Sequence, residues 1–268
     1  MSAPRSPDYA ILDRPEVLMF LFHPRKISGP AADSNRFREI RIPVEDDIAV
    51  GARFHMAHTR GPTILFFHGN GEIVADYDDI GPLFNRLGLN LMAVDYRGYG
   101  CSDGTPTVAT MMADCHRILE FSEKWKGQNG FSGPMIVMGR SLGSASALEL
   151  AAACPEGIDG LIVESGFAWA GPLLRRLGVD PDRLGFNESS GFANVGKIER
   201  FDKPTLIIHA EFDHIIPFSD GQALFEASAA EEKELMVIPR ANHNDIFMRG
   251  LDGYLDAVSR LARKTAPV

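Results

Sequence analysis

The sequence of 268 residues has only three cysteines and no surplus of basic side chains. Its 27 lysines and arginines are outnumbered by 36 aspartates and glutamates, which gives a formal net charge of −9. Because nucleic-acid binding depends largely on basic side chains that neutralise phosphates, we expect no nucleic-acid partner. Cys101, Cys115 and Cys154 form no CxxC pair, and an odd number cannot all be bridged within one chain. Three reduced thiols are therefore expected, and they favour a cytoplasmic location.

Long apolar runs are absent as well. The run at residues 17–22 (VLMFLF) is far too short to cross a bilayer, so no integral membrane segment is expected. No basic region precedes this run and no small-residue cleavage site follows it, as a signal peptide would require. We interpret it as an N-terminal helix that packs on the domain.

Short apolar runs alternate with longer amphipathic stretches along the chain, a pattern typical of buried strands and the helices between them. The strand-length runs are residues 62–67, 89–95, 134–138, 158–163, 204–209 and 235–238. The expected helices cover about 73–87, 107–126, 142–153, 219–230 and 245–262. This order predicts a single α/β domain over residues 1–268 with a doubly wound, mostly parallel sheet. Residues 36–56 predict a pair of antiparallel strands at one edge of that sheet.

Residues 168–200 interrupt the alternation. The segment is too long for a simple connection between helix and strand and too apolar for a disordered linker. We interpret it as a short helical cap inserted over the carboxyl edge of the sheet, where open α/β sheets bind their ligands. The large apolar side chains of this region are the candidate substrate-binding residues: Phe167, Trp169, Leu173, Phe186 and Phe192.

A GxSxG motif, residues 139–143 (GRSLG), lies between the run 134–138 and the expected helix 142–153. A serine on a sharp turn from strand to helix needs small neighbours on both sides, because the backbone there is crowded. Such a turn exposes the hydroxyl at the start of the helix, where the backbone N–H of Leu142 points at a developing oxyanion. Ser141 is therefore the candidate nucleophile.

An HGxG segment, residues 68–71 (HGNG), ends the run 62–67. In this place, one strand–helix–strand unit before the serine, the segment predicts a second oxyanion donor, the backbone N–H of Asn70. The segment at 95–104 (DYRGYGCSDG) has no catalytic step assigned to it. In that segment we expect Asp95 and Arg97 to form an ion pair.

An acid and a histidine follow later strands in the order that a triad requires. Asp213 comes after the run 204–209, and His243 comes after the run 235–238. His243 would take the proton of Ser141, and Asp213 would hold the imidazole tautomer and stabilise the imidazolium. Glu164, at the end of the run 158–163, is an alternative acid. No metal site and no organic cofactor are expected.

Together, HGNG, DYRGYGCSDG, GRSLGS, HAEFDHIIPF and ANHNDI resemble the α/β-hydrolase superfamily of serine hydrolases over roughly residues 36–260. The likeness is to the small-cap branch that includes bud-emergence-type hydrolases and the eukaryotic depalmitoylating α/β-hydrolase-domain proteins. It implies the α/β-hydrolase fold, a triad of Ser141, Asp213 and His243, and oxyanion donors at Asn70 and Leu142. Ala210 stands where the family often has glycine. The cysteine-rich N-terminus of the depalmitoylating members is missing, so a membrane-bound acylated-protein substrate is not expected.

These features predict hydrolysis of a small-molecule carboxylic ester or thioester through an acyl-serine intermediate. A peptidase or amidase on the same frame is one alternative, for which Glu188, Asp180 and Asp182 would be the acidic residues of the cap. A non-catalytic ligand-binding protein is the other, although such proteins commonly lose a member of the triad. The sequence does not indicate an oligomeric state.

Overall fold

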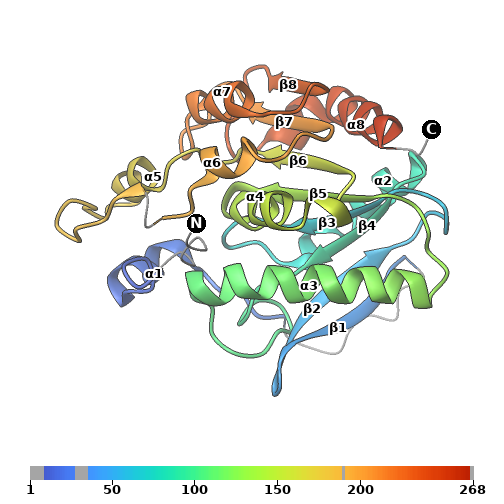
Figure 1. Ribbon diagram of the computed structural model, residues 1–268, viewed down its shortest axis with the longest axis horizontal. Helices are drawn as coiled ribbons and strands as arrows, with labels where there is room; N and C mark the ends of the chain where they lie inside the picture. Colours follow the sequence, from blue (N-terminus) through green and yellow to red (C-terminus); the bar gives the residue numbers. More distant parts are fainter. Residues whose placement is uncertain (1–8, 28–35, 189–190, 266–268) are drawn as a thin grey trace, which may run out of the picture.

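The structure, a computed structural model, describes residues 9–27, 36–188 and 191–265. Its centre is an eight-stranded sheet of order β1-β2-β4-β3-β5-β6-β7-β8 (Figure 1). The strands are β1 (Arg38–Glu45), β2 (Ile48–His55), β3 (Thr63–Phe67), β4 (Asn90–Val94), β5 (Met135–Arg140), β6 (Gly160–Glu164), β7 (Thr205–Ala210) and β8 (Lys233–Ile238). β2 is antiparallel to both of its neighbours, and the pairs from β4 to β8 are parallel. The predicted mostly parallel sheet with an antiparallel edge pair is confirmed.

Helices cover both faces of the sheet, as the predicted doubly wound fold requires. One apolar core includes side chains of α1 (Pro15–Leu21), α3 (Val108–Gln128), α4 (Ser144–Ala153), α5 (Ala170–Arg176), α6 (Asn194–Ile198) and α7 (Phe218–Ala227). A second core includes those of α2 (Gly81–Arg86), α8 (Ile246–Lys264) and the 3₁₀ helix η1 (Val74–Tyr77). Because successive side chains of a strand point to opposite faces, Leu65 of β3 lies in the first core and Phe66 in the second.

The apolar runs are uninterrupted because the inner strands have no face in water. Every residue of β3, β4, β5, β6 and β7 is buried. The edge strand β1 instead alternates between buried and exposed residues, so one of its faces meets solvent. Alternating residues in the edge strand and continuous apolar runs in the inner strands are typical of a parallel sheet that is covered by helices on both faces.

The expected helix over 73–87 is wrong in detail, because the structure divides it into η1 and α2. Pro82 lies in the first turn of α2. Proline has no N–H to donate to the preceding turn and disfavours helical geometry at the residue before it. A helix can therefore begin near Pro82, but one continuous helix over 73–87 is disfavoured.

Among the described residues of the segment that joins β6 to β7, two α-helices form: α5 and α6. The side-chain amide of Asn194 donates to the Phe167 carbonyl oxygen at 2.8 Å, and Asp220 of α7 accepts from the Ala168 N–H at 2.8 Å. These bonds join the start of the segment to α6 and to α7. Residues 189 and 190 of the expected cap lie outside the described residues, as do 1–8, 28–35 and 266–268 of the expected domain.

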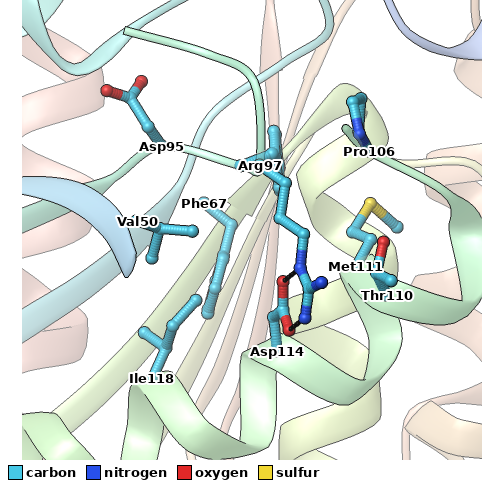
Figure 2. Close-up of a pocket in the computed structure, with 10 residues that line it drawn as sticks. Val50, Phe67, Asp95, Arg97, Pro106, Thr110, Met111, Asp114 and Ile118 are labelled. Atoms are coloured by element: carbon cyan, nitrogen blue, oxygen red, sulfur yellow. Dashed lines mark hydrogen bonds and ion pairs between the residues drawn. The ribbon is translucent and has the colours of Figure 1, made fainter. Parts of the chain in front are cut away.

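The expected ion pair between Asp95 and Arg97 is wrong. Arg97, just after β4, forms a bidentate pair with Asp114 of α3, with N–O distances of 2.7 and 2.8 Å (Figure 2). Its third contact is Glu45 at the end of β1, at 2.7 Å. Asp95 instead accepts from the Val74 N–H at 2.9 Å. Arg97 lies in the turn that follows β4, where the chain is no longer extended, and its guanidinium there meets Asp114 of α3 rather than Asp95.

We expect the Arg97–Asp114 pair to contribute strongly to stability. The Asp114 side chain is 7% exposed and that of Arg97 12%, whereas Glu45 is 63% exposed. Replacing Asp114 by Asn leaves a charge largely buried without its partner and should lower the free energy of unfolding by about 3 kcal/mol. Glu45→Gln removes only a solvated contact and should cost under about 1 kcal/mol. Urea unfolding followed by circular dichroism measures both, and equal losses would contradict this ranking.

Candidate active site

Ser141 lies on a sharp turn between β5 and α4, with a positive φ of 51°. Two glycines make the turn possible. A Cβ at Gly139 would lie 2.3 Å from the carbonyl oxygen of Gly143, and a Cβ at Gly143 would lie 2.1 Å from the carbonyl oxygen of Phe67. Both distances are far inside van der Waals contact, so only glycine fits. The turn holds a serine in left-handed backbone geometry at the start of a helix, a strained position that is common at functional sites.

The side chains of Ser141, His243 and Asp213 form a continuous hydrogen-bonded chain. His243 Nε2 lies 3.0 Å from Ser141 Oγ, and His243 Nδ1 lies 2.7 Å from Asp213 Oδ2. A carboxylate can only accept, so Nδ1 carries the proton and Nε2 is free to accept from the serine hydroxyl. All three residues are buried, although they come from three separate loops.

Asp213 is held by the main chain that follows it. Its Oδ1 accepts from the N–H groups of Ile215 at 3.0 Å and Ile216 at 2.8 Å. Burial by itself would raise the pKa of Asp213, but the hydrogen bonds from His243 and the Ile216 amide outweigh it and hold that pKa below its ordinary value. Asp213 is therefore an anion at neutral pH, with one oxygen used for its own loop and the other for the imidazole.

Glu164, the alternative acid, points elsewhere. Its Oε2 accepts from the Tyr254 hydroxyl at 2.7 Å, and its Oε1 lies 3.5 Å from Arg140 Nη1. Burial raises the pKa of Glu164 above its ordinary value, against the lowering effect of Arg140. The structure thus brings Asp213, and not Glu164, into contact with the imidazole of His243.

The turn after β3 carries the predicted oxyanion residue Asn70. The Asn70 Oδ1 accepts from the Tyr99 hydroxyl at 2.8 Å and from the His23 N–H at 2.7 Å, while its Nδ2 donates to His23 Nδ1 at 2.8 Å. This side chain is thereby fixed, and Asn70 lines the same cavity as Ser141 and Leu142.

His68 supports this turn from beneath. Its Nδ1 lies 2.8 Å from the Gly69 carbonyl oxygen and its Nε2 lies 3.1 Å from Asp95 Oδ1. Both partners are acceptors, so both ring nitrogens donate and the ring is an imidazolium. Burial alone would lower the pKa of His68, but the hydrogen bond and the charge of Asp95 outweigh it and raise that pKa.

The cavity beside Ser141 has a volume of about 330 Å³, near the lower end of the roughly 300–1,000 Å³ typical of small-molecule sites. Its lining combines apolar side chains with Ser141, His243 and the turn that carries Asn70. The described residues that line it are Phe20, Leu21, His23, Gly69, Asn70, Glu72, Arg140, Ser141, Leu142, Leu173, Leu177, Ile215, His243 and Asn244.

Of the five candidate substrate-binding residues, the structure places only Leu173 in this lining. Phe167 and Phe192 are buried in the core, where their rings pack edge to face at 5.2 Å. Trp169 is 40% exposed and Phe186 is packed against the first core, and neither is among the described lining residues. Large apolar side chains indicate burial. For Phe167, Phe186 and Phe192 this burial is against the hydrophobic core and not in the cavity.

The sequence reasoning missed the N-terminal wall of the cavity, formed by Phe20, Leu21 and His23. Helix α1 was expected to pack on the domain, and it does so next to the cavity. In Figure 1 α1 and α5 lie at the same end of the molecule. No local pattern marks these residues as lining, because their position depends on contacts such as that between His23 and Asn70, 47 residues apart.

The structure also bears on metal ions and membranes. Within residues 9–27, 36–188 and 191–265, no group of three or more His, Cys, Asp or Glu side chains is arranged to hold a metal ion. None of the helices in those ranges combines the length and the hydropathy that a membrane span requires.

Comparison with known proteins identifies relatives. Residues 59–179 match the family described as serine aminopeptidase S33. The chain is 30% identical to the α/β-hydrolase domain-containing protein aho-3 of Caenorhabditis elegans over 77% of its own length, and 32% identical to the human α/β-hydrolase domain-containing protein 17B over 70%. It spans 61% and 62% of those two proteins, less than two thirds of each. An uncharacterised protein of Mycobacterium tuberculosis is 30% identical, with 85% of this chain and 80% of that protein covered.

Solved structures with low sequence identity share the fold. The esterase Pf2001 of Pyrococcus furiosus superposes with a TM-score of 0.73 at 18% identity, covering 91% of this chain and 99% of the esterase. A soluble variant of the monoglyceride lipase of Saccharomyces cerevisiae gives 0.68 at 16% identity, covering 89% and 99%. The sheet order, the turn at Ser141, the sequence relatives and these neighbours agree, and the chain belongs to the α/β-hydrolase superfamily.

Proposed function

We propose that this protein is a serine hydrolase that cleaves a carboxylic ester or thioester of a small molecule through an acyl-serine intermediate. One observation carries the proposal: the chain of contacts from Ser141 Oγ to His243 Nε2 at 3.0 Å and from His243 Nδ1 to Asp213 at 2.7 Å. These are hydrogen-bond distances for a nucleophile, its base and the group that orients the base.

The proposed reaction has two halves. Ser141 Oγ attacks the acyl carbon while its proton passes to His243 Nε2, and the backbone N–H groups of Asn70 and Leu142 stabilise the oxyanion. His243 then protonates the departing alcohol or thiol, which leaves an acyl-serine. A water molecule, deprotonated by His243, attacks that ester and releases the acid and the free serine. Asp213 stabilises the imidazolium in both halves. The scheme needs no resident metal or organic cofactor.

The chemistry of the cavity supports an uncharged acyl group as its occupant. Leu173, Leu177 and Ile215 line one part, and Phe20 and Leu21 another. Glu72 is the only carboxylate among the described lining residues, and it is paired with Arg140 at 2.9 Å. A charged substrate would therefore find no free countercharge here, whereas an alkyl chain would bury apolar surface.

We further propose that residues 168–200 act as a cap on this cavity within a single domain over 1–268. Leu173 and Leu177, from and just after α5, are the contribution of that segment to the lining. A cytoplasmic location also stays a prediction, and the three free cysteines are compatible with it.

The peptidase alternative receives less support, because the acidic residues of this segment have structural partners. Glu188 accepts from the N–H groups of Ala170 at 3.0 Å and Gly171 at 2.6 Å, at the start of α5. Asp182 pairs with Arg175 at 2.8 Å, and Asp180 accepts from the Asp182 N–H at 3.0 Å. An enzyme that binds the free amino terminus of a peptide needs a carboxylate available to its substrate. The carboxylates of Glu188, Asp182 and Asp180 instead contact groups of the protein itself.

The nucleophile is tested by covalent labelling. A fluorophosphonate probe should label the protein at one site, and Ser141→Ala should abolish labelling and lower ester hydrolysis to a residual level. In serine hydrolases the loss of a triad member leaves only about 10³–10⁴-fold catalysis over water. Ser144→Ala is the matched control, since that hydroxyl donates to the Ser141 carbonyl oxygen at 2.6 Å and does not contact His243 in this structure. Full labelling of the Ser141→Ala variant would assign the nucleophile to another residue.

The acid is tested with Asp213→Asn beside Glu164→Gln. Asparagine at 213 removes the charge and permits the wrong imidazole tautomer, a change that lowers kcat by about 10⁴ in a serine protease with this triad. Glu164→Gln can still accept from Tyr254 and should lower kcat far less. The measurement is kcat on one activated ester, with thermal melts to show that both variants fold. A folded, active Asp213→Asn protein beside a folded, inactive Glu164→Gln protein would transfer the role to Glu164.

The size of the cavity predicts a preference for short to medium acyl chains. Among p-nitrophenyl esters, kcat/KM should be higher for butyrate and hexanoate than for palmitate, and aminoacyl anilides should be poor substrates. Leu173→Trp should reduce the hexanoate value at least about 10-fold more than the acetate value, because it fills the apolar wall. Trp169→Ala, at a more exposed position outside the lining, is the control and should leave the ratio unchanged. A wild-type maximum at palmitate would contradict the assignment of this cavity.

A further inference from the structure

A largely buried ion pair between Arg140 and Glu72 contacts the three loops of the site. Arg140, the last residue of β5, places Nε 2.9 Å from Glu72 Oε1. The side chain of Arg140 is 9% exposed and that of Glu72 24%. Replacing a buried ion pair by apolar side chains is often neutral or stabilising, so stability alone is a weak reason for charges in this place. The contacts that the pair makes with its surroundings are more informative.

Each catalytic loop is attached to this pair. Arg140 directly precedes Ser141, so the guanidinium is fixed relative to the nucleophile. Its Nη2 donates to the main-chain carbonyl oxygen of His243 at 2.9 Å. On the other side, Glu72 Oε2 accepts from the Gly69 N–H at 2.7 Å, in the turn that presents the Asn70 amide. One cation and one carboxylate thus connect nucleophile, base and oxyanion turn.

Further groups keep the pair ionised and rigid. The Tyr77 hydroxyl donates to Glu72 Oε2 at 2.6 Å. Burial by itself would raise the pKa of Glu72, but the charge of Arg140 and the Tyr77 hydroxyl outweigh it and hold that pKa below its ordinary value. Glu164 lies beyond the guanidinium, with its Oε1 3.5 Å from Arg140 Nη1. A planar guanidinium presents its donors in a fixed fork, which allows it to hold two loops at a defined separation.

We propose that Arg140 and Glu72 are positioning residues of the active site, which set the distances between Ser141, His243 and the oxyanion turn without touching the substrate's reacting atoms. This inference rests on the proposed hydrolase function. It assigns to the pair an effect on the rate of the chemical steps rather than on substrate binding, because misplacement of a catalytic group by about 1 Å can cost about 10²-fold in rate.

Conservative variants separate positioning from folding. Glutamine at 72 has one acceptor oxygen, so it can serve Arg140 or the Gly69 N–H well but not both. Lysine at 140 keeps the charge, but its single ammonium cannot reach both Glu72 and the His243 carbonyl oxygen in the geometry of the fork. Tyr77→Phe removes only one hydrogen bond to Glu72. Asp114→Asn is the matched control, because it also breaks a buried arginine–carboxylate pair, one that has no contact with the catalytic loops.

The experiment is steady-state hydrolysis of p-nitrophenyl butyrate, with rates divided by the number of sites that the fluorophosphonate probe labels at completion. We expect Glu72→Gln and Arg140→Lys each to lower kcat per labelled site by about 10- to 100-fold, with KM within about threefold of wild type. Tyr77→Phe should lower kcat by about 3- to 10-fold, the effect of one hydrogen bond. Asp114→Asn should lower the melting temperature and leave kcat per labelled site unchanged.

The double variant Glu72→Gln/Arg140→Lys tests whether the pair acts as a unit. If it does, the loss in kcat should be close to that of the worse single variant and well below the product of the two. Variants that lower only the melting temperature, with wild-type kcat per labelled site, would overturn the proposal. If the Glu72 and Arg140 variants do not fold, Tyr77→Phe is the deciding variant, and a wild-type kcat for it would overturn the proposal. A wild-type protein without Ser141-dependent labelling or hydrolysis would instead refute the proposed function, which is a separate result.

Discussion

The main chain of the turn after β5 approaches the end of β3 so closely that a methyl group would not fit between them. Gly143 faces the carbonyl oxygen of Phe67 at this contact, and Gly139 faces Gly143 within the turn. The contact forces Ser141 into a positive φ and directs its hydroxyl out of the sheet toward His243. It also places the first amide of the following helix beside the turn after β3. The relative positions of Ser141 and the turn that carries Asn70 are therefore set by steric exclusion between backbones.

Around that contact the interior is polar, which is unusual for the middle of a parallel sheet. Arg140 and Glu164 are buried, Glu72 is partly buried, and the fully buried side chains of His68 and Asp95 lie 3.1 Å apart next to the turn that carries Asn70. Charges in a site of low dielectric interact more strongly than in water and keep their partners in fixed positions. The base of the site is thus a rigid network of charges and hydrogen bonds. The walls, by contrast, are apolar and include Phe20, Leu21, Leu173, Leu177 and Ile215.

Those walls come from three segments far apart in the chain. Phe20 and Leu21 belong to the N-terminal helix, Leu173 belongs to the connection between β6 and β7, and Ile215 lies in the loop after β7. The N-terminal segment is tied to the oxyanion turn through His23 and Asn70, so the same contact that closes one wall also fixes an oxyanion residue. The N-terminal helix and the connection between β6 and β7 contribute no side chain to the proposed triad, whereas Ile215 lies on the loop that holds Asp213. Substitutions in the first two segments can therefore alter the walls without replacing a residue of the triad.

The sequence by itself determined the sheet, its edge pair, the turn at Ser141 and the order of nucleophile, acid and histidine. Those features depend on local rules: strand and helix periodicity, the need for glycine where no Cβ fits, and the meeting of parallel strand ends at one edge. Only the tertiary structure decided that Asp213 and not Glu164 meets His243, that Arg97 pairs with Asp114, and that α1 and not Phe167 or Phe192 lines the cavity. Each of these depends on which side chains meet across loops tens of residues apart. A strand end places several carboxylates and aromatic rings within reach of one site, and packing then determines which of them contact it.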